Sequence, residues 1–234
     1  MKESDIDGIL QSAPVPEGPR SETLQSIAAA IRGSLRPVRP LPAPWLLTAG
    51  LVFVSATIAL AAAAHAGFDG IEKMAPWERA LIFIPLGAFA VVAAKTFVRT
   101  MIPGSRRRLS AGALLALCTL SLLGAFALSF RDYQIDHFVS AGFACLVTGL
   151  LHAFPAGLLA WFLLRRGFAV NAIAAGLAAG TLAGLVGLGV LELHCVNFQA
   201  AHVLVWHTAV VPLSGALGAT CAAVGQWIRR LATR

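Results

Sequence analysis

Six long stretches of apolar residues, separated by short segments that hold most of the charges, set the pattern of this chain. Each stretch is close to the roughly 20 residues that an α-helix needs to cross about 30 Å of hydrocarbon. The stretches lie at 45–66, 79–98, 111–129, 139–164, 169–191 and 202–227. The sequence therefore predicts an all-α integral membrane protein with six transmembrane helices.

Composition favours a membrane protein over a water-soluble one. Hydrophobic residues make up 58% of the chain and charged residues 12%, whereas soluble domains average roughly 45–50% apolar residues. A net charge of +7 would suggest nucleic-acid binding in a soluble protein, but here the cations follow the segments between spans. We therefore expect the lipid bilayer as a partner and no direct contact with nucleic acid.

The distribution of the cations predicts the orientation. Fourteen of the 18 lysines and arginines lie before the first span, after the second and fourth spans, or after the sixth. Because segments rich in lysine and arginine stay in the cytoplasm, both termini are expected there. The opposite ends of the spans form what we call the outer face, which carries the loops after spans one, three and five.

The pattern divides the chain into a cytoplasmic tail over 1–44, a six-helix bundle over 45–228 and a basic cytoplasmic C-terminus over 229–234. Within the tail, "SETLQSIAAAIRGSL" predicts a short amphipathic helix, and "RPVRPLPAPW" predicts a stiff, proline-rich spacer. The apolar face of the helix comprises Leu24, Ile27, Ala28, Ile31 and Leu35. So short a helix needs a surface to lie on, which can be the membrane, the bundle or a soluble partner protein. A disordered tail without a partner is the alternative.

The outer face gathers most of the candidate chemistry. Its residues include five of the six histidines and two of the four cysteines, which are His65, His137, His194, His202, His207, Cys145 and Cys195. Thiolate and imidazole are natural ligands for zinc, copper(I) or cadmium, and an oxidising exterior would also allow the two thiols to pair as a disulfide. The alternative is that the imidazoles are ordinary interfacial side chains and the cysteines inert ones. No permanent cofactor is predicted, and the candidate for a transient metal ion is the set Cys145, Cys195 and His194.

Other polar residues receive structural interpretations. His152 lies near the middle of the fourth span, where we expect a hydrogen bond between helices. Glu192 is one of six acids expected in or beside the outer loops. Gly176, Gly180 and Gly184 line one helix face, which favours close packing inside the bundle or an interface between copies. The sequence has no acid/base dyad, nucleophile elbow, phosphate loop or HExxH motif, so we do not expect an enzyme.

Two segments, "LRPVRPLPAPW" over 35–45 and "HCVNFQAAHVLVWHTAVVPLSGALG" over 194–218, resemble the negative regulator of sigma F (NrsF) family. The resemblance implies a six-span anti-sigma factor in the bacterial inner membrane, whose cytoplasmic tail holds an extracytoplasmic-function sigma factor until an envelope signal releases it. It also implies that two cysteines toward the periplasm take part in perceiving the signal, and these correspond to Cys145 and Cys195.

We therefore expect an anti-sigma factor that responds to metal or oxidant. The sensing residues are expected to be Cys145, Cys195, His194, His202 and His207. The residues expected to bind the sigma factor are Leu24, Ile27, Ala28, Ile31 and Leu35. Two alternatives are a small membrane transporter or channel, and a redox protein that binds a metal or haem at its outer face through His65, His202 or His207.

Overall fold

The computed structural model describes residues 21–34, 42–102, 104–105, 109–166, 169 and 171–232. The chain separates into two units, Met1–Leu41 and Pro42–Arg234. In the first unit the described element is helix α2, Ser21–Ser34. Leu35 and most of the predicted proline-rich spacer lie outside the described residues.

Helix α2 has the amphipathic character that its sequence predicts. Leu24, Ile27 and Ile31 lie at helical spacing and are each about half exposed, while Ala28 between them is partly buried. Glu22 lies in the first turn, where an acidic side chain interacts favourably with the helix dipole. The first unit therefore presents large apolar side chains on one face of a short helix.

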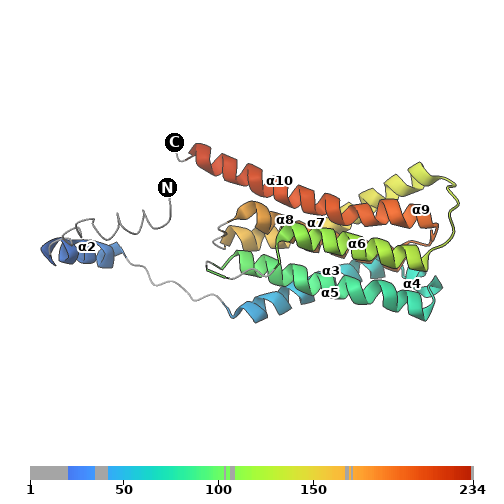
Figure 1. The fold of residues 1–234 in the computed structure, drawn as a ribbon, viewed down its shortest axis with the longest axis horizontal. Coiled ribbons are helices and arrows are strands. Elements are labelled where there is room, and N and C mark those ends of the chain that lie inside the picture. The colour runs from blue at the N-terminus through green and yellow to red at the C-terminus, as the bar shows by residue number, and fades with distance from the viewer. Residues whose placement is uncertain are drawn as a thin grey trace, which may run out of the picture. The chain divides into compact units, whose positions relative to one another are not determined.

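The second unit is a bundle of long helices (Figure 1). Its helices are α3 (Pro44–Ala66), α4 (Asp69–Lys73), α5 (Pro76–Thr100), α6 (Ala111–Ser129), α7 (Phe138–Arg166), α8 (Ala172–His194), α9 (Ala200–His202), the π-helix η1 (Val203–His207) and α10 (Thr208–Ala232). Helices α9, η1 and α10 run on without a break, and this composite helix together with α3, α5, α6, α7 and α8 gives six helices long and apolar enough to cross a membrane. The prediction of six spans is confirmed.

Local sequence explains where several helices begin. Pro44 and Pro76 occupy the first turns of α3 and α5, where a proline costs no hydrogen bond. The side-chain oxygen of Asn171 accepts a hydrogen bond of 3.0 Å from the backbone N–H of Ala174, which caps α8. As a result α8 starts three residues later than predicted and continues to His194. Glu192 therefore lies in the last turn of α8, beside the loop as predicted, and His194 is the last residue of this helix rather than part of the loop.

Helix α8 lies at the centre of the bundle and packs against α3, α5, α6, α7 and α10. Small residues make this position available because they let neighbouring backbones approach closely. A Cβ atom at Gly180 would overlap the carbonyl oxygen of Ser214, and one at Gly176 would overlap that of Gly218, both on α10. The face formed by Gly176, Gly180 and Gly184 therefore packs against α10 of the same chain. It is not available as an interface with a second copy.

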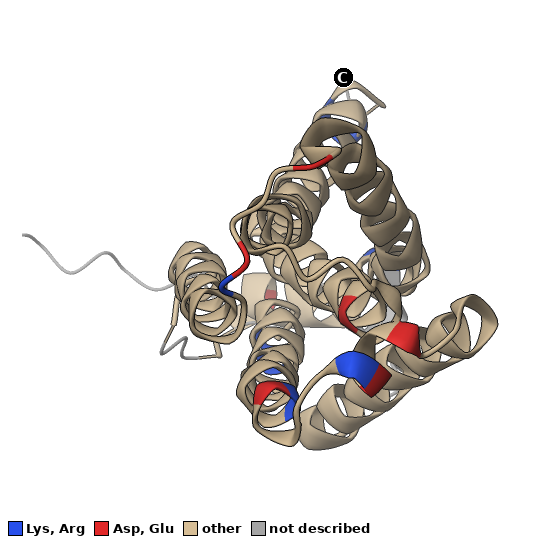
Figure 2. Ribbon diagram, turned by 90° about the vertical axis from the view of Figure 1, so that its right-hand side faces the viewer, with Lys and Arg blue, Asp and Glu red and all other residues tan. Residues whose placement is uncertain are grey.

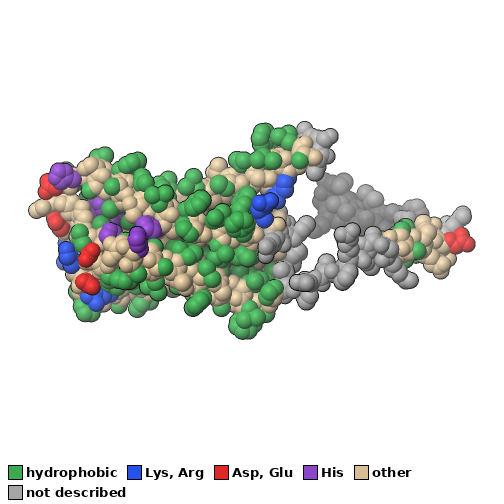
Figure 3. Space-filling model, turned by 180° about the vertical axis from the view of Figure 1, so that it is seen from behind, with side chains coloured by type: hydrophobic (Ala, Val, Ile, Leu, Met, Phe, Trp, Pro, Cys, Tyr) green, Lys and Arg blue, Asp and Glu red, His purple; other side chains and the backbone are tan. Residues whose placement is uncertain are grey.

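The surface of the bundle matches a membrane environment. Large apolar side chains such as Phe53, Ile84, Leu151 and Phe154 are 66–73% exposed, which in water would be a large unfavourable apolar patch. Hydrophobic side chains cover the middle of the bundle, whereas histidines and acidic residues gather at one end (Figure 3). These features, with the six long helices, indicate a multi-pass membrane protein.

We call the end of the bundle that contains α4, α9 and the end of α8 the thiol end. Figure 2 looks onto this end and shows acidic and basic residues on its connections and helix termini. Two contacts join its loops: the backbone N–H of Ala200 donates to the carbonyl oxygen of Asp132 at 2.5 Å, and the rings of Phe130 and Phe198 stack with centroids 5.4 Å apart. The segment after α8 is thereby fixed to the segment after α6.

Candidate thiol and imidazole centre

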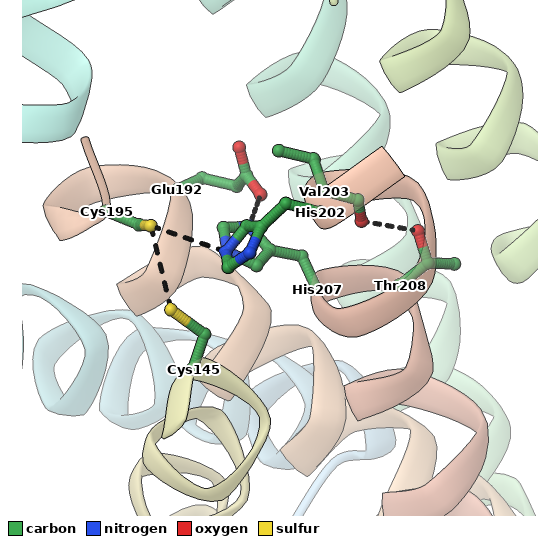
Figure 4. Close-up of polar contacts among 7 residues, drawn as sticks. All are labelled: Cys145, Glu192, Cys195, His202, Val203, His207 and Thr208. Atoms are coloured by element: carbon green, nitrogen blue, oxygen red, sulfur yellow. Dashed lines mark hydrogen bonds and ion pairs between the residues drawn. The ribbon is translucent and has the colours of Figure 1, made fainter. Parts of the chain in front are cut away.

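Four side chains from three parts of the bundle converge at the thiol end (Figure 4). Cys145 comes from α7, Cys195 directly follows α8, His202 ends α9 and His207 ends η1. Their sulfur and nitrogen atoms lie within 4.8 Å of one another, a grouping that could hold a metal ion. The two imidazoles are buried and the two thiols partly buried. We call these four residues the thiol centre.

Both cysteines of the thiol centre are free. The Sγ atoms of Cys145 and Cys195 are 3.7 Å apart, and the Sγ of Cys195 is 3.9 Å from Nε2 of His202. The hydrogen bond with Cys145, and then burial, raise the pKa of the Cys195 thiol, while the neighbouring imidazoles of His202 and His207 lower it. The net shift is upward, so the thiol form of Cys195 is favoured at neutral pH.

A buried ion pair adjoins the thiols. Nδ1 of His207 lies 2.7 Å from Oε1 of Glu192, and the two side chains are 2% and 1% exposed. The carboxylate accepts the Nδ1–H, which fixes the ring orientation and directs Nε2 away from it. Nε2 of His207 is buried without a hydrogen-bond partner among the described residues, an arrangement that typically costs about 1–3 kcal/mol.

The π-helical turn explains why two histidines five positions apart meet at one place. In an α-helix, residues five apart point about 140° away from each other, because each residue advances the helix by about 100°. The wider turn of η1 reduces that angle, and the rings of His202 and His207 lie with centroids 5.0 Å apart. The Thr208 hydroxyl donates to the carbonyl oxygen of Val203 at 3.4 Å. Single π-turns of this kind occur frequently at functional sites.

Glycines on neighbouring helices hold the thiol centre in place. Gly142, three residues before Cys145 on α7, leaves room for the indole of Trp206, which a Cβ atom would overlap. Gly70 on α4 packs against the backbone of Cys195, whose carbonyl oxygen would lie 2.7 Å from a Cβ atom there. These close approaches fix η1 against α7 and the end of α8 against α4.

A cavity of about 280 Å³ opens beside the thiols. Cys145 and Cys195 line it together with Asp69, His194 and Asn197, among others. His194 therefore lines the same cavity as the thiols, but it is not one of the four residues whose donor atoms lie within 4.8 Å of one another. The two cysteines of the predicted metal set belong to this group, whereas its imidazoles are those of His202 and His207 and not that of His194.

The remaining histidines and cysteines lie outside the thiol centre. His65 and His137 are exposed. Nδ1 of His152 lies 2.8 Å from the carbonyl oxygen of Thr148 on its own helix. The predicted hydrogen bond was one between helices, whereas the observed one lies within α7. Cys118 is buried in α6 and Cys221 exposed on α10.

Sequence reasoning missed two contributors to the thiol centre. Glu192 was expected in or beside a loop with no part in the site, because its partner His207 lies 15 positions further along the chain. Nothing in the sequence indicated that Trp206 would contact Gly142 on α7. The π-helical turn of η1 could not be predicted either, because a π-turn depends on the packing around it.

Comparisons with known proteins identify the family. The family model described as negative regulator of sigma F matches residues 32–227, which include the whole thiol centre and nearly all of the bundle. Residues 21–31 of helix α2 lie before the matched residues, and its last turn lies within them. No curated protein and no solved structure matches the chain. The family match confirms the resemblance carried by the two sequence segments: the chain belongs to the NrsF family, the negative regulators of sigma F.

Proposed function

We propose that the protein is an anti-sigma factor that holds an extracytoplasmic-function sigma factor at the inner membrane and releases it when a metal ion or an oxidant acts on the thiol centre. Family membership implies negative regulation of a sigma factor. The observation that carries the sensing step is the convergence of two thiols and two imidazoles within 4.8 Å of one another. Both chemistries, metal ligation and disulfide formation, are available to such a group.

The thiol centre is proposed to face the periplasm. Arg99 lies in the last turn of α5, Arg165 lies at the end of α7, and Arg229 and Arg230 lie in the last turn of α10. These are the ends of the helices remote from the thiol centre. Segments rich in arginine remain in the cytoplasm during insertion. This orientation exposes the cysteines to the compartment in which envelope metals and oxidants act.

The sigma factor is proposed to bind α2. Leu24 is 52% exposed and Ile27 48% exposed on a helix of 14 residues, a length that is marginally stable by itself. Amphipathic helices commonly bind partner proteins by laying such a face into an apolar groove. Ala28 and Ile31 extend the same face, and Leu35 stays a prediction because it lies outside the described residues.

Binding can be tested by expressing the full chain with each extracytoplasmic-function sigma factor of its host in turn and isolating the complex in detergent. We expect one sigma factor to co-purify, and Leu24→Asp to reduce its recovery at least tenfold because the charge would have to enter the apolar contact. Ser26→Asp, on the opposite side of α2, is the matched control and should retain binding. Failure of every sigma factor to co-purify, or equal recovery with both variants, would contradict this role for α2.

Signal perception can be tested in cells with a reporter gene that the identified sigma factor transcribes. Zinc, cadmium or diamide should induce the reporter in cells with the wild-type chain. Cys145→Ser and Cys195→Ser should abolish the response to at least one of these, and Cys118→Ser, distant from the thiol centre, should leave it unchanged. A normal response from both variants to all three agents would exclude the thiol centre as the sensor.

A further inference from the structure

The geometry of the thiol centre points to a specific ligand. We propose that it is a four-coordinate site for a single divalent cation of the zinc type, bound by Sγ of Cys145 and Cys195 and by Nε2 of His202 and His207, with Glu192 as the positioning residue for His207. The metal site itself does not depend on the proposed function. Its biological role does, because the bound cation would be the signal that releases the sigma factor. The proposed site leaves out His194, which the sequence had favoured.

The spacing of the donor atoms fits a tetrahedral site. Zinc–sulfur bonds of about 2.3 Å in tetrahedral geometry separate two sulfur ligands by about 3.8 Å. The Sγ atoms of Cys145 and Cys195 are 3.7 Å apart. A sulfur and a nitrogen ligand should stand about 3.6 Å apart on the same basis, and Cys195 Sγ lies 3.9 Å from Nε2 of His202. All four donor atoms lie within 4.8 Å of one another, so the proposed site requires them to draw closer together by rotation of the side chains.

Glu192 supplies the support that ligating histidines usually have. A metal-bound imidazole almost always donates its other N–H to a carboxylate or carbonyl, which fixes the tautomer. Nδ1 of His207 has such a partner in Glu192 at 2.7 Å. Its Nε2 is buried and has no hydrogen-bond partner among the described residues. That nitrogen is oriented and available for a ligand, in a side chain that is 2% exposed.

Charge balance favours a divalent cation in this apolar setting. Binding converts two thiols to thiolates and takes the Nε2 proton from the imidazolium of the His207–Glu192 ion pair, so three protons leave. The dication with two thiolates and two neutral imidazoles then has no net charge of its own, and the carboxylate of Glu192 keeps its hydrogen bond from the Nδ1–H of His207. The cavity of about 280 Å³ is lined by Cys145 and Cys195 and offers a path by which the ion can enter and the protons can leave.

The site also links metal binding to helix conformation. Its ligands come from α7, from the residue that follows α8, and from the last residues of α9 and of η1. Because the π-turn brings His202 and His207 together, an ion bound to both stabilises η1. Helix α10 continues directly from η1 and packs along α8. Occupancy of the site would therefore stabilise the start of the last helix, which runs from this site to the opposite end of the bundle.

The test uses the purified full-length chain in detergent, stripped with a chelator under reducing conditions. Titration with zinc chloride against a chromophoric competitor should give one ion per chain. Cobalt chloride should give the intense visible bands of tetrahedral cobalt together with sulfur-to-cobalt charge-transfer absorption. Glu192→Gln should keep the cobalt spectrum and weaken zinc binding by about 10- to 100-fold.

Removing a ligand should have larger effects. Cys145→Ser, Cys195→Ser and His207→Ala should each lower zinc affinity beyond the Glu192→Gln effect and, for the cysteines, reduce the charge-transfer band. His194→Ala and Cys118→Ser should leave both readouts unchanged. Circular dichroism and size-exclusion profiles identify any variant that fails to fold, and the wild-type cobalt spectrum tests the site without any substitution.

Three results would overturn the proposal: no stoichiometric zinc in the wild type, an octahedral cobalt spectrum, or unchanged affinity in both cysteine variants. None of these involves a sigma factor, so each leaves the proposed anti-sigma function standing with an oxidant as its signal. Conversely, tight zinc binding by a chain that captures no sigma factor would support the site and remove the proposed function.

Discussion

The carboxylate of Glu192, on the last turn of α8, lies 2.7 Å from the imidazole of His207 at the end of η1, and both side chains are buried. The pair ties the central helix of the bundle to the start of the last one. Removing one member of such a pair leaves the other buried and uncompensated, which is more costly than removing both.

A double-mutant cycle should therefore show strong coupling. Glu192→Ala and His207→Ala should each destabilise the bundle by about 3–5 kcal/mol, and the double variant should cost less than the two effects added, by about 1–3 kcal/mol. Unfolding in detergent, followed by tryptophan fluorescence, measures these energies. Combining Glu192→Ala with His152→Ala, whose hydrogen bond is to Thr148, is the control and should be additive. Additivity in the first cycle would show that the pair contributes no coupling.

Mild oxidation should cross-link Cys145 to Cys195. Their Sγ atoms are 3.7 Å apart, and a disulfide requires about 2.05 Å, which rotation of the two side chains can supply. The two thiols lose two electrons and two protons to diamide, the oxidant. Maleimide labelling with a mass readout should show two thiols lost in the wild type and in Cys118→Ser, and none lost in Cys195→Ser. Bound zinc should slow the reaction, and equal loss in Cys195→Ser would point to another pair.

Close packing of α8 against α10 should make Gly180 intolerant of a side chain. A Cβ atom there would overlap the carbonyl oxygen of Ser214, whereas one at Gly189 would meet Leu86 at an ordinary 3.7 Å. We expect Gly180→Ala to destabilise the bundle by about 1–3 kcal/mol, and Gly189→Ala to be neutral or to stabilise it by up to about 1 kcal/mol through helix propensity. Thermal unfolding in detergent compares them. Equal melting temperatures for Gly180→Ala and Gly189→Ala would mean that α8 and α10 can move apart at Gly180 without loss of stability.

Reporter fusions should establish the orientation. Alkaline phosphatase, which folds only outside the cytoplasm, should be active when fused after Tyr133 in the segment between α6 and α7, and inactive after Ser105 between α5 and α6. Green fluorescent protein at the C-terminus should fluoresce, because the arginines near the end of α10 keep that end in the cytoplasm. The reverse pattern would place the thiol centre in the cytoplasm and exclude an envelope signal acting on it directly.

The fold was largely predictable because a membrane span is a local property. About 20 consecutive apolar residues satisfy the bilayer whatever surrounds them, so the six spans were found within a few residues of their observed ends. The fifth span was displaced by three residues, since the cap formed by Asn171 and the buried last turn at Glu192 both depend on neighbouring helices.

The thiol centre was predictable only in part. Hydrophobic pattern and charge placed Cys145, Cys195, His202 and His207 toward one face, because depth in the membrane follows from position along a span. His194 entered the predicted metal set because it is adjacent to Cys195 in the chain, and adjacency along a chain does not bring side chains to a common point.

The sequence by itself determined the membrane class, the number of spans, the amphipathic character of α2 and the face on which the cysteines lie, all of which follow from the order of apolar and polar residues. Only the tertiary structure decided which imidazoles stand beside the thiols, that Glu192 pairs with His207, and that a π-turn joins His202 to His207. These relationships depend on rotation of each helix about its axis and on the close contacts made at Gly142 and Gly180. Rotation is set by packing against neighbouring helices, which in lipid depends on the fit of small residues rather than on hydrophobic pattern.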